Sequence, residues 1–173
     1  MSSPTRLFVT ADIHGSFTTW MTIKELMKPG DSLMIAGDLF DTRYGNYSHT
    51  DFQPEFIKKE IQNISQKFYY VYGNCDVPSF FPGYGSAIKF KALNKNLFLH
   101  HGHGNKLVPN DADIIIQGHT HLCFLAKKEN QIFMNPGTIT NPRNNLYTYG
   151  IIDKFSARIL DLKTGNPLSS IEF

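Results

Sequence analysis

The chain has 173 residues, of which 41% are hydrophobic, 13% aromatic and 18% charged. This length suits a single domain, and the composition supplies enough apolar side chains for a sizeable core, which excludes a disordered chain. The formal net charge of +2 is too small to bind nucleic acid or membranes on electrostatic grounds alone. We therefore expect one globular domain over residues 1–173, whose partners must be inferred from its sites.

The two cysteines, Cys75 and Cys123, cannot form a disulfide framework, so we expect reduced thiols. The first residues run directly into a strand-like segment without the apolar stretch of a secretory signal. No apolar run approaches the roughly 18 to 20 residues that a membrane span requires. We expect a cytoplasmic protein that does not enter the membrane.

Apolar periodicity predicts about eight short strands, with two helices between the first three. The expected strands cover residues 7–12, 32–38, 68–74, 96–101, 113–118, 131–135, 149–153 and 157–162. The expected helices cover residues 17–27, with Ser16 as the N-cap, and 53–66, with Pro54 in the first turn. The first half thus has a β-α-β-α-β order, which predicts a parallel core. The short connections of the second half predict antiparallel or mixed strands that close a second sheet.

Two segments rich in glycine and aromatic residues, 42–52 and 77–87, are longer than the usual connection of about four to six residues. Loops of this kind often carry substrate contacts. The second contains Phe80, Phe81 and Tyr84, which could stack on a nucleobase. Packing of this loop on the sheet, or a subunit contact, is the simpler interpretation.

Six of the seven histidines follow an expected strand within about three residues of its C-terminal end, and His49 stands apart. Five of these six histidines belong to a series of five short clusters, and the other ligand candidates in the series have carboxylate or amide side chains. The clusters are Asp12-Ile-His14, Gly37-Asp38-Leu-Phe-Asp41, Gly73-Asn74-Cys75-Asp76, His101-Gly-His103 and Gly118-His119-Thr-His121. Open α/β sheets bind ligands beyond the carboxyl ends of their strands. These clusters can therefore converge on one site.

The residue types in these clusters predict a metal centre. Residues two apart on extended backbone point to the same side, so both members of Asp12-x-His14, and both of His119-x-His121, can reach one pocket. Imidazole and carboxylate with few thiols suit Mn, Fe, Ni or Zn. Seven donors are the number expected for two ions that share one carboxylate: Asp12, His14, Asp38, Asn74, His101, His119 and His121. The glycines before Asp38, Asn74 and His119 permit tight turns and close backbone approach.

The ordered series D-x-H, G-D-x-x-D, G-N-x-D, H-G-H and G-H-T-H resembles the calcineurin-like metallophosphoesterases. The segments G-N-C-D, H-G-H, G-H-T-H and N-P-G-T resemble their small bacterial and archaeal phosphodiesterase branch, the YfcE type. The resemblance runs from Asp12 to Thr138 and implies a two-sheet β-sandwich flanked by helices, an αββα fold. It also implies two sets of ligands: Asp12, His14, Asp38 and His121 for a first ion, and Asp38 as a bridge to a second ion held by Asn74, His101 and His119.

The resemblance further implies a metal-dependent phosphodiesterase that attacks its substrate with a hydroxide bridging two ions. Two divalent ions with two carboxylates and a hydroxide leave a charge of about +1, which attracts an anionic ester. Cys75 stands where related G-N-H-D enzymes carry a histidine that assists the leaving group. His103 or a metal-bound water could assist instead, and a packing role for His103 is an equal alternative. We therefore expect small diesters with good leaving groups to be the substrates.

Three further side chains are candidates for supporting roles. Asp41 and Asp76 are expected to orient the ligands by hydrogen bonds, with a cap or turn role as the alternative for each. Arg43 could approach the phosphate, as the arginine of the related G-D-x-x-D-R-G motif does, although the match is shifted by one residue here. The segment 135–138 is expected to form a turn that presents backbone near the ligand loops.

Other functions stay open at this point. A eukaryotic relative in the retromer coat keeps the fold, has Asn at the position of His14 and binds other proteins, so a non-catalytic metal-binding scaffold is one alternative. A phosphomonoesterase is another, although protein Ser/Thr phosphatases need a longer chain and a G-N-H-E segment. Nucleic-acid processing is not favoured, because it rests only on a mildly basic composition and the aromatic loop. A homo-oligomer is compatible with the sequence, which does not set the oligomeric state.

Overall fold

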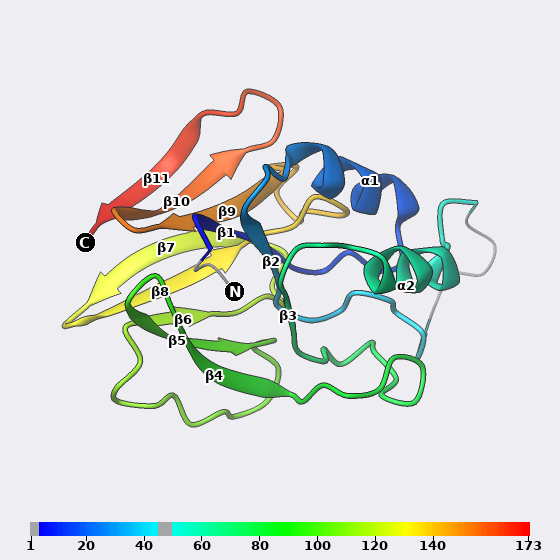
Figure 1. Cartoon of the computed structure of the whole chain (residues 1–173), viewed down its shortest axis with the longest axis horizontal. Helices are drawn as coiled ribbons and strands as arrows, with labels where there is room; N and C mark the ends of the chain where they lie inside the picture. Colours follow the sequence, from blue (N-terminus) through cyan, green and yellow to red (C-terminus); the bar gives the residue numbers. More distant parts are fainter. Residues whose placement is uncertain (1–3, 45–49) are drawn as a thin grey trace.

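The computed structural model describes residues 4–44 and 50–173. The chain forms two β-sheets that pack face to face, and the helices lie together at one side of this sandwich (Figure 1). The predicted two-sheet fold is therefore confirmed. Part of the predicted loop 42–52, including His49, lies outside the described residues.

The first sheet has six strands in the order β11-β10-β9-β1-β2-β3. Its parallel part is formed by β1 (Arg6–Thr10), β2 (Asp31–Ile35) and β3 (Phe68–Tyr70). β9 (Thr148–Asp153) runs antiparallel to β1 and is followed by β10 (Ser156–Asp161) and β11 (Pro167–Glu172). The expectation that the second half of the chain closes the second sheet is wrong for these last three strands, because β9 returns to the free edge of β1.

The second sheet has five strands in the order β4-β5-β6-β8-β7. Its centre is parallel and consists of β5 (Lys95–His100), β6 (Ile114–Ile116) and β8 (Gln131–Pro136). β4 (Ala87–Ala92) and β7 (Cys123–Lys128) pair antiparallel at its two edges. This sheet is thus mixed, as the short connections of the second half predict.

The three strands that the apolar periodicity does not reveal, β4, β7 and β11, are all edge strands. Most of their side chains are exposed or half-buried, and β4 and β7 carry lysines. Edge strands tolerate charged side chains, which also discourage pairing with another chain. The alternation of apolar residues that marks a buried strand is therefore weak in each of them.

The helices are α1 (Phe17–Leu26) and α2 (Pro54–Gln62). Ser16 caps α1, because its side chain accepts a hydrogen bond from the backbone N–H of Thr19. α2 ends four residues before the predicted position 66. Its end is fixed by Asn63, whose side-chain amide donates to the carbonyl of Lys59 at 2.8 Å.

Two apolar layers hold the sandwich together. One lies between the sheets and includes Leu99 and Ile116, and the other lies between the first sheet and the helices and includes Trp20 and Ile57. The aromatic loop 77–87 packs into the second layer, where the rings of Phe40 and Phe81 lie 5.2 Å apart. Packing on the sheet thus accounts for this loop, as in the simpler of the two interpretations. None of the helices in residues 4–44 and 50–173 is long and apolar enough to cross a bilayer.

Candidate metal centre

The ligand candidates lie in the loops that follow the parallel strands of both sheets. Asp12 follows β1, Asp38 follows β2 and Asn74 follows β3, whereas His101 follows β5 and His119 follows β6. A hydrogen bond joins the loops of the two sheets: the backbone N–H of His119 donates to the side-chain Oδ2 of Asp12 at 3.0 Å. The carboxyl ends of strands from both sheets therefore meet at one edge of the sandwich.

The backbone at this edge is left-handed at five of the ligand candidates. The φ angles are 55° at Asp12, 51° at His14, 51° at Asp38, 71° at His119 and 59° at His121. The expectation of extended backbone here is wrong. Left-handed non-glycine residues are uncommon and cluster at functional sites, although Asp and His tolerate this conformation better than most residues.

One group of ligand atoms belongs to Asp12, His14 and His121, which lie within 4.8 Å of one another. Nε2 of His14 lies 3.2 Å from Nε2 of His121, and the latter atom lies 3.6 Å from Oδ1 of Asp12. These residues come from both sheets. We refer to them as cluster A.

A second group belongs to Asp38, His101 and His119, whose ligand atoms also lie within 4.8 Å of one another. Nε2 of His101 lies 3.0 Å from Oδ2 of Asp38 and 3.2 Å from Oδ1 of Asn74. We refer to these four residues as cluster B. His119 thus belongs to cluster B and His121 to cluster A. An extended backbone would have pointed both side chains into the same pocket.

Asp38 lies between the two clusters. Besides its place in cluster B, it forms a further group within 4.8 Å with His14 of cluster A and with the thiol of Cys75. Its Oδ1 atom accepts a hydrogen bond from the backbone N–H of Cys75 at 2.7 Å. Asp38 therefore reaches both clusters. Asp12 of cluster A also approaches cluster B, since its Oδ1 lies 4.0 Å from Nε2 of His101, but Asp38 lies closer at 3.0 Å.

Three of the histidines are held in defined orientations by oxygen acceptors. Nδ1 of His101 lies 2.7 Å from the carbonyl of Ala36, Nδ1 of His121 lies 2.8 Å from the carbonyl of Asn141, and Nδ1 of His14 lies 3.2 Å from the carboxylate of Asp41. Because these oxygens can only accept, Nδ1 carries the proton in each case. In the neutral ring, Nε2 is then an acceptor that faces the clusters.

Glycines allow the loops to approach this closely. A Cβ atom at Gly73 would overlap the side chain and backbone nitrogen of Asp38, and one at Gly37 would overlap the ring of His101. A Cβ atom at Gly118 would lie 2.7 Å from both Ala11 Cβ and the carbonyl oxygen of Ala36. The three glycines that precede ligand candidates thus stand where no side chain fits.

Burial and neighbouring charges perturb the titration of these groups. Burial raises the pKa of Asp12 to about 6, although His101 and His121 oppose this shift. Burial also acts to raise the pKa of Asp38, but the hydrogen bond with His101 and the charge of that ring lower it to about 2. Burial acts to lower the pKa of His101, but Asp38 raises it above its usual value. Protons are thus held among closely packed carboxylates and imidazoles, where a cation can displace them.

Cys75 has a different character from the other groups. Burial and the neighbouring carboxylate of Asp38 raise the pKa of its thiol far above the usual value. The thiol therefore stays protonated at neutral pH. A protonated thiol is a poor metal ligand and a weak acid.

The two supporting carboxylates make different contacts. Asp41 bonds directly to His14, as described above, whereas Asp76 accepts from backbone N–H groups, at 2.9 Å from both Phe40 and Gly73. Asp76 is buried and joins the loop after β2 to the loop after β3. Its contacts are those of a turn-holding residue.

The N-P-G-T segment braces two ligand loops. The side chain of Asn135 donates to the carbonyl of Gly118 at 2.8 Å, and the hydroxyl of Thr138 donates to the carbonyl of Asp12 at 2.9 Å. Both residues are fully buried. They fix the backbone on either side of the site.

His103 lies beside cluster B, and two arginines act on the neighbouring histidines through their charge. The ring of His103 lies 5.4 Å from that of His101, and its Nδ1 has no hydrogen-bond partner among the described residues. Burial lowers the pKa of His103, and Arg43 adds a smaller shift in the same direction. Arg143 acts in the same way on His119. Arg143 could not be predicted from the sequence motifs, because it belongs to none of them, and only its position shortly after the N-P-G-T segment could have indicated it.

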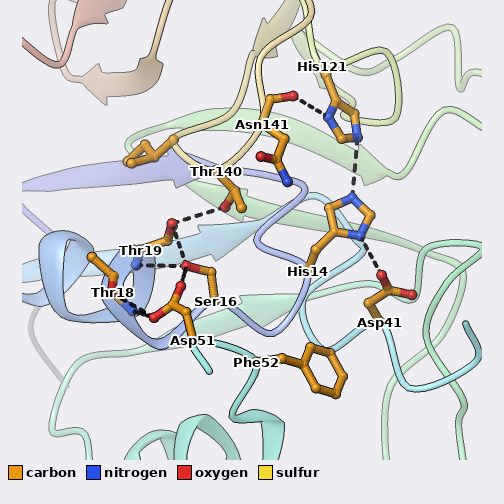
Figure 2. Close-up of a pocket in the computed structure, with 11 residues that line it drawn as sticks. His14, Ser16, Thr18, Thr19, Asp41, Asp51, Phe52, His121, Thr140 and Asn141 are labelled. Atoms are coloured by element: carbon orange, nitrogen blue, oxygen red, sulfur yellow. Dashed lines mark hydrogen bonds and ion pairs between the residues drawn. The ribbon is translucent and has the colours of Figure 1, made fainter. Parts of the chain in front are cut away.

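A cavity of about 650 Å³ opens beside cluster A (Figure 2). His14, His121 and Asp41 form one side of it. The other sides come from the start of α1, from Asp51 and Phe52, and from residues 139–141. The metal-ligand candidates thus border a space large enough for a small organic group.

Comparison with known proteins identifies the family. The family model described as the calcineurin-like phosphoesterase superfamily domain matches residues 6–155. The phosphodiesterase YfcE of Escherichia coli K12 is 27% identical over an alignment of 179 positions. The alignment covers 96% of this chain and 97% of that protein.

Solved structures agree with this result. A structure of the E. coli phosphoesterase YfcE superposes with a TM-score of 0.83 at 25% identity and covers 96% of this chain and 98% of that one. The vacuolar protein sorting protein 29 of Cryptosporidium parvum shares the fold, with a TM-score of 0.69 at 17% identity and 99% coverage of both chains. The family and the phosphoric ester hydrolase class expected from the motifs are confirmed: the chain belongs to the calcineurin-like phosphoesterase superfamily.

Proposed function

We propose that this chain is a phosphodiesterase that uses two divalent metal ions to hydrolyse small phosphate diesters. Cluster A with Asp38 would hold the first ion, and cluster B would hold the second, with Asp38 as the shared ligand. The observation that carries this proposal is the position of Asp38 between two groups of donors. The names of the E. coli relatives support the diesterase activity.

The donors fit such ions in their chemistry and orientation. In cluster A the Nε2 atoms of His14 and His121 face each other at 3.2 Å, although hydrogen bonds at Nδ1 leave both as acceptors in the neutral rings. In cluster B, Nε2 of His101 lies 3.0 Å from Oδ2 of Asp38 and 3.2 Å from Oδ1 of Asn74, where either a proton or a cation can join these atoms. Acceptors that face one another repel, and a cation between them converts this repulsion into coordination.

The donor set also limits the choice of metal. The thiol of Cys75 stays protonated, so the ligands are imidazole nitrogens with carboxylate and amide oxygens. Such mixed nitrogen and oxygen sets suit Mn, Fe, Ni and Zn, whereas thiolate-rich sets select softer metals. We propose that the two bound ions are drawn from these four metals, manganese included.

The two ions, when bound, would lower the pKa of a bound water and neutralise charge on the phosphate oxygens. The protein supplies the geometry: Asp38 fixes the separation of the ligand sets, and Asp41 holds His14 in the required tautomer. The positive charges of Arg43 and Arg143, which lower the pKa values of His103 and His119, would attract an anionic ester. These contributions position a phosphate and stabilise its charge without a covalent enzyme intermediate.

The departing alcohol receives little help from Cys75, because its thiol holds its proton tightly. His103 is the candidate for this role, since its ring borders cluster B and its Nδ1 has no hydrogen-bond partner among the described residues. Burial lowers the pKa of His103, so the ring is neutral near pH 7 and only a small fraction can donate a proton. We therefore propose that diesters with good leaving groups are hydrolysed fastest.

Metal removal and restoration test this function. The protein is stripped with a chelator, loaded separately with Mn, Fe, Ni or Zn, and assayed with bis(p-nitrophenyl) phosphate and with p-nitrophenyl phosphate. We expect metal-dependent turnover that is faster on the diester. Faster turnover of the monoester would instead identify a phosphomonoesterase. No turnover with any ion, despite proven loading, would favour a non-catalytic metal-binding scaffold.

A further inference from the structure

The segment that follows the N-P-G-T turn is fixed to cluster A on two sides. The hydroxyl of Thr140 lies 3.1 Å from the carbonyl of Ile13, in the turn that carries His14. The backbone carbonyl of Asn141 accepts from Nδ1 of His121 at 2.8 Å. The backbone of residue 141 is therefore held directly beside a ring that is proposed to bind the first ion.

The side chain of Asn141 lines the cavity beside cluster A together with the rings of His14 and His121 (Figure 2). The residue is exposed, and its bond to His121 uses the backbone carbonyl. Within the part of the chain that the structure describes, its side-chain amide forms no hydrogen bond. Two N–H groups next to the proposed ion are thus free to donate to a ligand.

The other donors of the cavity wall already have acceptors within the protein. The hydroxyls of Ser16 and Thr18 donate to the two oxygens of Asp51, and the hydroxyl of Thr19 lies 3.0 Å from that of Thr140. The two histidine rings donate at Nδ1, as described above, and the described lining residues include no lysine or arginine. Among these residues, the amide of Asn141 is the side-chain donor that remains available.

We propose that Asn141 is a phosphate-binding residue, whose side-chain amide donates a hydrogen bond to a non-bridging oxygen of a diester held at cluster A. This inference rests on the proposed phosphodiesterase function and adds a substrate contact to it. The non-bridging oxygens of a phosphate diester share one negative charge and only accept hydrogen bonds. A hydrogen bond to such an oxygen is stronger than one between neutral groups and fixes the orientation of the phosphate.

A neutral donor suits this position. A lysine or arginine at residue 141 would place its positive charge beside the proposed ion and oppose metal binding. An amide can donate to the phosphate without adding charge. The next residue is Pro142, whose ring restricts the backbone conformations of Asn141, so less freedom is lost when the side chain binds the ester.

Asn141→Ala tests the contact by kinetics. The substitution removes the amide but keeps the backbone carbonyl that holds His121, so metal content and metal affinity should stay at the wild-type values. With bis(p-nitrophenyl) phosphate we expect kcat/KM to fall by about tenfold, the effect of one hydrogen bond to a charged group. Most of this loss should appear as a higher KM, because the oxygen carries its charge in the bound ester as well as in the transition state.

Asn130→Ala is the matched control. Asn130 is exposed in the turn before β8, at the opposite end of the sheet from the ligand loops. Its KM and kcat should equal those of the wild type. An unchanged KM in Asn141→Ala at wild-type metal content would overturn the phosphate contact and leave the phosphodiesterase function intact.

Asn141→Asp separates binding of the phosphate from a purely structural role. Aspartate keeps the shape of the side chain but replaces the donor with a negatively charged oxygen, which repels the ester. At equal metal content we therefore expect a higher KM for Asn141→Asp than for Asn141→Ala. If the side chain only supported the loop, aspartate would be the milder substitution, and that order would overturn the proposal.

A spectroscopic measurement does not depend on turnover. In the ¹⁵N-labelled protein loaded with zinc, which is diamagnetic, the side-chain amide signal of Asn141 is identified by its absence in Asn141→Ala. We expect its proton signal to move downfield when ethyl methylphosphonate, a phosphonate with one negative charge, is added, while the signal of Asn130 stays in place. An unmoved Asn141 signal at saturation would overturn the contact. Absence of turnover with any ion, despite proven loading, would overturn the proposed function and this inference with it.

Discussion

The backbone N–H of Cys75 donates to Oδ1 of Asp38 at 2.7 Å, while Oδ2 of the same carboxylate lies 3.0 Å from Nε2 of His101. The two oxygens of Asp38 therefore make different contacts. One is oriented by the loop after β3, and the other faces cluster B. The position of this carboxylate between the clusters depends on its being able to accept at both oxygens.

Asp38→Asn should abolish both the coupled binding of two ions and the hydrolysis of diesters. The amide has nearly the same shape, but it removes the negative charge and replaces one acceptor with a donor. Metal content measured after dialysis should fall to one ion or fewer, and turnover should be lost. Retention of turnover by the variant would contradict the bridging role of Asp38.

Asp41→Ala should weaken one metal site selectively. Asp41 holds His14 by a hydrogen bond at Nδ1, and loss of such a partner of a metal-binding histidine typically costs about 10- to 100-fold in affinity. Calorimetric titration should show one weakened binding step and one unchanged step. Asp111→Ala serves as the control, and equal titrations of the two variants would show that Asp41 does not support a site.

Much of this site could be predicted because its residues lie in short motifs at the ends of buried strands. The buried strands β1, β2 and β5 have clear apolar patterns, and the residues that follow them meet at one edge. The division of His119 and His121 between two clusters is what the family resemblance implies, but it could not be predicted from the local spacing, which would bring both side chains to one pocket. It depends on left-handed backbone at both residues, with φ angles of 71° and 59°, and such angles are fixed by tertiary hydrogen bonds.

The pairing of β9 with β1 could not be predicted from the local apolar pattern either. Thr148–Asp153 has the apolar pattern of a buried strand in either sheet, so its pattern does not select a partner. Contacts far apart in sequence decide the matter, such as the pairing of Phe8 with Ile151. The cavity wall was missed for the same reason, since it combines the start of α1 with residues 139–141.

Gly73→Ala should disrupt the metal centre even though alanine is the smallest replacement. A Cβ atom at this position would overlap the side chain and the backbone nitrogen of Asp38. The loops after β2 and β3 would have to separate, which moves Asp38 and Asn74 apart. We expect loss of metal binding by calorimetry and a lower melting temperature.

Gly85→Ala is the matched control for this substitution. Gly85 also has no left-handed φ angle, and a Cβ atom there would meet nothing closer than 3.4 Å. This variant should bind metal and melt like the wild type. If Gly73→Ala behaved in the same way, the close approach of the two loops would not be a requirement of the site.

Asp76→Asn should reduce the stability of the fold without removing a proposed ligand. The buried carboxylate accepts from the N–H groups of Phe40 and Gly73, and an amide can accept at only one of its two terminal atoms. At least one buried N–H then loses its partner, which should lower the free energy of unfolding by about 1 to 3 kcal/mol. Urea denaturation of the metal-free protein measures this loss, with Asp111→Asn as the exposed comparison. Equal midpoints for the two variants would mean that the loops after β2 and β3 are held together by other contacts.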